Sequence, residues 1–132
     1  MAEVKTIVTH WTTICSNVDT GDGLFVPVSG YMNAADVDKI RCTFEVVAAT
    51  DSSSVIQPGI QTANVEDAAD TADLITGINS ETGNGFNFAG AFCDVSGDTN
   101  GKQLVRLGFW FKTSAASLQS ARVWARWQIT KI

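Results

Sequence analysis

Alternation of hydrophobic and polar residues predicts three antiparallel β-strands, at residues 39–46, 103–113 and 121–132. A period of two places every second side chain on the same face of a strand, so we expect one buried face on each. The side chains expected in the core are Ile40, Cys42, Phe44, Val46, Val105, Leu107, Phe109, Phe111, Val123, Ala125, Trp127 and Ile129. The opposite faces then carry Arg106, Trp110, Arg122, Trp124 and Arg126.

Weaker patterns predict further strands between clusters of turn residues. These strands are expected at residues 5–12, 24–29, 54–62, 74–79 and 86–94. The dipeptide Asn100-Gly101 is typical of a type I′ hairpin, which requires positive φ at both positions. It predicts that the strand ending at Asp94 pairs with the strand beginning at Lys102. We therefore expect the last three strands to form a meander.

One segment has a helical pattern. Asn64 is a candidate N-cap, and Asp67 stands at the third helical position, as in a capping box. This predicts one short helix near residues 65–75. About eight short strands and one helix predict a single all-β domain over residues 1–132, an antiparallel β-sandwich of the jelly-roll type.

The composition agrees with a folded domain. The chain has 132 residues, of which 45% are hydrophobic and 17% charged; the charged share is below the ~25% of an average domain and indicates extensive burial. Residues 1–5 lack the apolar run typical of a signal peptide, and no apolar run is long enough to span a membrane. Three widely spaced cysteines, Cys15, Cys42 and Cys93, do not suggest a disulfide framework. We expect synthesis in a cytoplasm and no membrane partner.

The charges are unevenly distributed. The net charge is −5, which disfavours binding to nucleic-acid phosphates. No Lys or Arg lies between Arg41 and Lys102, and no acidic residue follows Asp98. Either copies of the chain associate through acidic and basic surfaces, or the two segments neutralise each other within one molecule.

Few residues suggest catalysis or metal binding. His10 is the only histidine, and neither a G-x-S-x-G turn, a phosphate-binding glycine loop nor a C-x-x-C pair is present. Residues 94–101 place oxygen-bearing side chains at alternate positions, as calcium loops do. However, position six is Thr99 and position twelve is Val105, so a polar loop is the favoured interpretation. We expect no enzymatic activity, no metal and no cofactor.

The outward aromatic and basic side chains are the candidate binding residues. Exposed tryptophan beside arginine is typical of interface hot spots, so Arg106, Trp110, Arg122, Trp124 and Arg126 are the predicted interface. The alternative is that a loop or the curvature of a sheet covers the tryptophans.

Residues 104–112 read LVRLGFWFK, and residues 114–123 read SAASLQSARV. This strand, small-residue loop and final strand resemble small β-sandwich proteins of tailed-phage particles, above all the capsid decoration (cement) proteins. The resemblance covers the last third of the chain. It implies a non-enzymatic protein that is made in the host cytoplasm, is located in the virion, forms a homo-oligomer (commonly a trimer) and binds the major capsid protein or another particle protein.

Two alternatives remain open. One is a carbohydrate-binding jelly-roll module that stacks sugars on Trp11, Trp110 or Trp124. The other is a phage tail or baseplate component. Tryptophans around a concave groove favour sugar binding, whereas tryptophans on an open face favour assembly.

Overall fold

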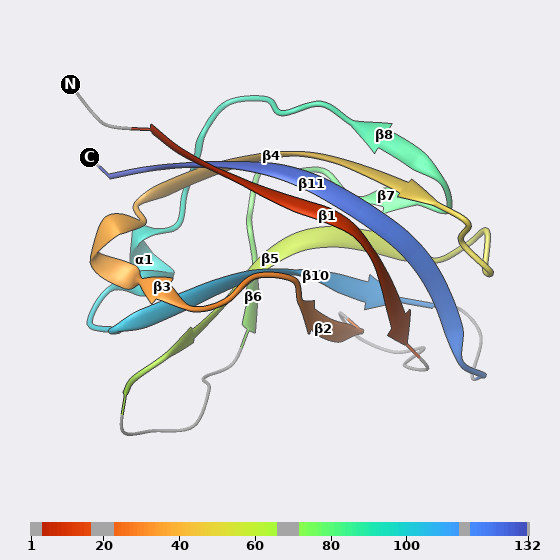
Figure 1. Ribbon diagram of the computed structural model, residues 1–132, viewed down its shortest axis with the longest axis horizontal. Helices are drawn as coiled ribbons and strands as arrows, with labels where there is room; N and C mark the ends of the chain where they lie inside the picture. The colour runs from red at the N-terminus through yellow and green to blue at the C-terminus, as the bar shows by residue number, and fades with distance from the viewer. Residues whose placement is uncertain (1–3, 17–22, 66–71, 114–116, 132) are drawn as a thin grey trace.

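The computed structural model describes residues 4–16, 23–65, 72–113 and 117–131, which form a sandwich of two antiparallel sheets (Figure 1). Sheet A has five strands: β1 (Val4–Ser16), β11 (Gln119–Thr130), β4 (Lys39–Val47) and β8 (Gly85–Asn87) in this order, with β9 (Cys93–Asp94) also paired to β4. Sheet B has six: β2 (Leu24–Pro27), β10 (Leu104–Lys112), β5 (Val55–Ala63) and β6 (Ala72–Leu74), with β3 (Met32–Asn33) on β10 and β7 (Glu81–Thr82) on β5.

The chain alternates between the two sheets. Strands β1, β4, β8, β9 and β11 belong to sheet A, and the strands between them belong to sheet B. This alternation is the strand order of a jelly roll, so the predicted all-β sandwich is confirmed. Two short turns, η1 (Ala34–Asp36) and α1 (Ser96–Thr99), lie together at one end, where Thr99 Oγ1 donates a hydrogen bond to the Val37 carbonyl at 3.2 Å (Figure 1). No helix in the described ranges is long and apolar enough to cross a membrane.

The core lies between the sheets and is formed by the faces that the alternation predicted. All twelve side chains expected there are buried. At its centre the Phe109 ring packs against Phe44 and Trp127, with centroids 5.5 and 5.3 Å apart. The indole Nε1 of Trp127 donates a hydrogen bond to Thr9 Oγ1 at 3.3 Å, which attaches β1 to the core. The predicted buried faces of these three strands are therefore confirmed.

The predicted meander is wrong. Strand β10 lies between β2 and β5 in sheet B, whereas β11 lies between β1 and β4 in sheet A. The predicted strand at 86–94 is two short strands, β8 and β9, and both pair with β4. Because β10 and β11 belong to opposite sheets, the connection between them crosses the sandwich.

The type I′ hairpin at Asn100-Gly101 is also wrong. Gly101 has the expected positive φ of 76°, but Asn100 has φ −61° and ψ 126°. These angles, with a hydrogen bond from the Lys102 N–H to the Thr99 carbonyl at 3.1 Å, describe a type II turn that follows α1. Because β9 pairs with β4, this turn joins the sheets and does not close a hairpin.

The helix predicted near residues 65–75 is replaced by a strand in its described part. Residues 72–74 form β6, in which Ala72 pairs with Gln61 and Leu74 with Gly59 on β5. Ile75 follows and is fully buried. Pairing with β5 provides these residues with backbone hydrogen bonds that a short helix would have made internally, while residues 66–71 lie outside the described ranges. The strand predicted at 74–79 therefore lies earlier in the chain.

Candidate interaction surfaces

The five predicted interface residues lie on two opposite faces of the sandwich. Arg122, Trp124 and Arg126 are on β11 and point away from the core on the outer face of sheet A. Arg106 and Trp110 are on β10 and point outward from sheet B. The structure therefore separates the set into two surfaces with different neighbours.

The outer face of sheet A carries a row of three aromatic rings, of which Phe86 and Phe88 are exposed and Trp124 is half-buried. Trp124 contacts Phe86 of β8 edge to face, with ring centroids 6.3 Å apart, and Phe86 contacts Phe88 in the same manner at 4.6 Å. Phe88 is 79% exposed and Phe86 is 43% exposed, although both are large apolar side chains. We call Phe86, Phe88, Arg122, Trp124 and Arg126 the aromatic–arginine face.

The two arginines of this face are exposed, and they flank Trp124 along β11. The Arg122 guanidinium lies over the ring of Trp11 in β1, 5.8 Å from its centroid. Arg126 lies opposite Val8 of β1, and Val8 is 51% exposed. Arginine beside apolar surface retains favourable contacts when water is removed, because its guanidinium is weakly hydrated and stacks on rings.

Next to this face, Arg41 of β4 is held within the molecule. Its Nε donates a hydrogen bond to Gln128 Oε1 at 2.6 Å, and its guanidinium lies 4.5 Å from the centroid of the Phe92 ring. Glu45, also on β4, lies opposite Trp124 and is half-buried. Arg41 is therefore already engaged within the chain, whereas Arg122 and Arg126 are exposed to a partner.

The outer face of sheet B is more completely covered by the chain itself. Trp110 packs edge to face on Phe25 of β2, with centroids 5.7 Å apart, and its ring lies directly over Gly59 of β5. Its indole Nε1 is buried, and no described residue accepts a hydrogen bond from it. Phe25 was not among the predicted interface residues, because its strand lacks clear alternation.

Arg106 is likewise held by neighbouring side chains. Its Nε donates a hydrogen bond to Gln61 Oε1 at 2.8 Å, and its guanidinium lies 4.7 Å from the centroid of the Tyr31 ring. Both outward tryptophans are half-buried, so the alternative that the fold covers them applies to each in part, and Trp110 also has its Nε1 buried. Of the two surfaces, the aromatic–arginine face is the more accessible to a partner.

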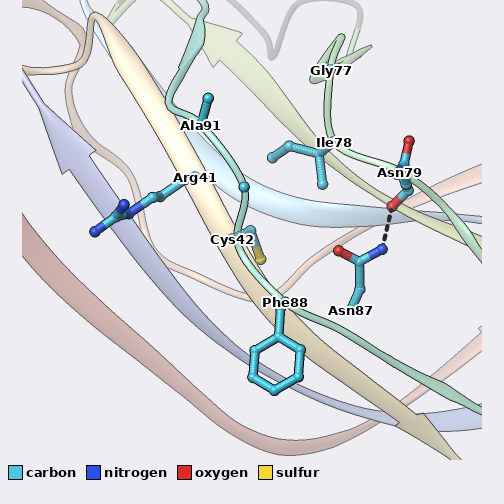
Figure 2. Close-up of a pocket in the computed structure, with 9 residues that line it drawn as sticks. Arg41, Cys42, Gly77, Ile78, Asn79, Asn87, Phe88 and Ala91 are labelled. Atoms are coloured by element: carbon cyan, nitrogen blue, oxygen red, sulfur yellow. Dashed lines mark hydrogen bonds between the residues drawn. The ribbon is translucent and has the colours of Figure 1, made fainter.

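A small pocket opens between β4 and the segments that cross it at residues 77–79 and 87–91 (Figure 2). Its volume is about 90 Å³, well below the ~300–1,000 Å³ of sites for drug-sized ligands. The Asn87 amide closes one side with a hydrogen bond to the Asn79 carbonyl at 3.4 Å, while Arg41 and Phe88 point away from it (Figure 2). None of its lining residues is a tryptophan. The pocket offers space for a few waters and no platform for sugar stacking.

The loop at residues 94–101 is organised by hydrogen bonds from its own residues. Asp94 Oδ1 accepts from the Ser96 N–H at 2.9 Å and from Ser96 Oγ at 2.6 Å. These hydrogen bonds from Ser96 lower the pKa of the Asp94 carboxyl below its usual value. Within the described residues, no three His, Cys, Asp or Glu side chains are grouped as metal ligands. His10 is exposed on β1, at a bulge between Thr9 and Thr12.

The three cysteines are free thiols in different surroundings. Cys15 is exposed on β1, Cys93 is half-buried, and Cys42 is buried in the core. Burial raises the pKa of the Cys42 thiol well above its usual value, because the thiolate would lose its hydration.

Comparison with known proteins gives matches of fold alone. No family model and no curated protein sequence matches the chain. The crystal structure of the infectious bursal disease virus VP2 subviral particle superposes on 98% of this chain with a TM-score of 0.64 at 14% identity. The chain shares its fold with part of VP2. The T=1 particles derived from this virus give a TM-score of 0.62 at 12% identity, and the structure of its Gx strain gives 0.61 at 16%. The chain spans about a third of the length of the proteins it matches, 31 to 32% in these three.

Proposed function

We propose that the chain is a non-enzymatic structural protein of a virus particle, specifically a decoration (cement) protein that binds the capsid shell and stabilises it. The observation that carries the proposal is the aromatic–arginine face. Arg, Trp and other aromatic residues are the residue types enriched where binding energy concentrates at interfaces. Its fold neighbours come from virus particles, which supports the same setting for this jelly roll.

The partner proposed for this face is the major capsid protein or another particle protein, and the proposed location is the virion. Half-buried Trp124, with exposed Arg122 and Arg126 beside it, fits an apolar pocket bordered by carboxylates on the shell. Arg106 and Trp110, on the other sheet, belong to a second contact with a different neighbour, such as another copy in a homo-oligomer. The resemblance to decoration proteins implies three copies.

The placement of the tryptophans favours assembly over sugar binding. Trp11 is on β1 at the edge of sheet A, Trp124 is on the outer face of that sheet, and Trp110 is on sheet B. Carbohydrate modules that stack several sugar rings need aromatic side chains along one groove. Here the tryptophans outside the core are divided between the two sheets.

Binding to capsids tests the proposal. We expect the chain to co-sediment with purified capsids of the virus that carries its gene, and the double variant Trp124→Ala with Arg126→Glu to bind at least about tenfold more weakly. Lys131→Glu is the matched control, because Lys131 is an exposed cation that follows β11 and lies outside both proposed contacts. It should bind as the wild-type chain does.

Two results would contradict the proposal. One is unchanged capsid binding by the double variant, which would place the contact outside the aromatic–arginine face. The other is a wild-type chain that ignores capsids and is retained on a polysaccharide column, which would favour the carbohydrate-binding module.

A further inference from the structure

Strand β1 forms a long, open edge of sheet A. It has 13 residues and, among those that the structure describes, it pairs only with β11 (Figure 1). Proteins usually protect such an edge by shortness, proline or several charges, because its unpaired N–H and C=O groups bind other strands. Over Val4–Ser16 the chain carries Lys5 as its one permanent charge and no proline. The edge is therefore weakly protected.

The hydrogen bonds of β11 show which residues of β1 face outward. The Ala125 carbonyl accepts from Thr9 Oγ1 on β1, at 3.4 Å. The Ser120 and Thr130 carbonyls accept from backbone N–H groups on the opposite side, where β4 lies, at 2.9 and 3.0 Å. Since backbone groups alternate in direction along an antiparallel strand, the odd-numbered residues of β11 bond to β1.

The same alternation defines the free groups of β1 before its bulge. Lys5 and Ile7, opposite Ile129 and Trp127, direct their N–H and C=O groups to β11. Val4, Thr6 and Val8 consequently direct theirs to the open edge. Their side chains are also exposed, at 48% for Val4 and 51% for Val8.

We propose that this edge pairs with β1 of a second copy, antiparallel and centred on Thr6. In this register Thr6 faces Thr6 of the second copy, Val4 faces its Val8, and Val8 faces its Val4. All three pairs use outward backbone groups, so each exchanges two hydrogen bonds. The exposed valines cover one another, and Lys5 lies opposite Ile7 of the second copy, so the two lysines do not face each other.

A second copy fits this edge because, in this register, its exposed Val4 and Val8 cover Val8 and Val4 of the first copy. A contact of this type has two-fold symmetry and closes at two copies. The pairing would place two aromatic–arginine faces side by side on one continuous sheet. Only this consequence rests on the proposed function. The pairing predicts a dimer in solution, where the resemblance to decoration proteins implies a trimer.

Sedimentation of the purified full chain tests the pairing. We expect twice the 14.1 kDa mass of one chain at about 100 μM, where a Kd of about 1 μM is saturated, and the mass of one chain on dilution far below the Kd. Thr6→Pro removes an outward N–H without removing a bond to β11, so this variant should be a folded monomer. Thr13→Pro is the matched control: Thr13 lies on the same edge beyond the bulge, outside the proposed register, and the variant should remain a dimer.

Amide hydrogen exchange keeps the proposal testable if a proline variant fails to fold. In the wild-type dimer the Thr6 and Val8 amides should exchange slowly, and dilution to monomer should accelerate them. The Lys5 and Ile7 amides should stay protected in both states.

A wild-type chain that is monomeric or trimeric at about 100 μM, or Thr6 and Val8 amides that exchange fast at every concentration, would overturn the pairing. A monomer that still binds capsids would leave the proposed function standing, whereas a dimer that ignores capsids would remove the proposed function alone.

Discussion

Replacing Phe109 with alanine should cost more stability than most substitutions in this chain. Its ring is 1% exposed and contacts two other buried rings, Phe44 and Trp127, at 5.5 and 5.3 Å between centroids. Removing a buried phenylalanine costs about 3–5 kcal/mol, because transfer energy is lost and a cavity remains. The two ring contacts, each worth about 0.5–1.5 kcal/mol, place Phe109→Ala in the upper half of this range. A drop of about 10–20 °C in Tm should follow for a domain of this size.

Urea unfolding followed by tryptophan fluorescence measures this loss, and Phe88→Ala is the matched control. The same side chain is removed there from a position that is 79% exposed, so stability should change by less than about 0.5 kcal/mol. If Phe109→Ala instead loses less than about 1 kcal/mol, the ring does not fill the core. The register of β10 would then be shifted by one residue, since such a shift exchanges the two faces of a strand.

Two further predictions concern the thiols and the loop at residues 94–101. Iodoacetamide should alkylate exposed Cys15 in the native protein and Cys42 only after unfolding, since Cys42 is buried and its raised pKa removes the reactive thiolate. Labelling of Cys42 in the native protein, detected by mass spectrometry, would contradict this. Calorimetry should detect no Ca²⁺ binding, because Asp94 Oδ1 already accepts two hydrogen bonds from Ser96. Heat of Ca²⁺ binding that disappears in the double variant Asp94→Asn with Asp98→Asn would show that the loop is a calcium site.

The core could be predicted from the sequence because a period of two is a local property. Alternation alone identified the buried faces that contain Phe44, Phe109 and Trp127, and all three are in the core. The partner of each strand could not be predicted in this way. A connection between two strands can have the same composition whether it turns back within one sheet or crosses to the other. The sequence therefore predicted β10 and β11 as neighbours in one sheet, which is wrong.

The candidate surface was only partly visible in the sequence. Alternation placed Trp124 and Trp110 outward, but it does not report what covers an outward side chain. Phe25, distant in sequence, packs on Trp110, and Phe86 contacts Trp124, so both outward tryptophans are half-buried. The spacing of Phe86 and Phe88 does indicate that they share one face of a strand. It does not indicate whether that face points to the core or to solvent.

The position of the chain on a virus particle tests the central claim most directly. A cryo-EM reconstruction of capsids decorated with the wild-type chain is predicted to show the jelly roll on the shell, with Trp124, Arg122 and Arg126 buried against a capsid subunit. Density that leaves the outer face of sheet A open to solvent, or particles that carry none of this chain, would contradict the claim.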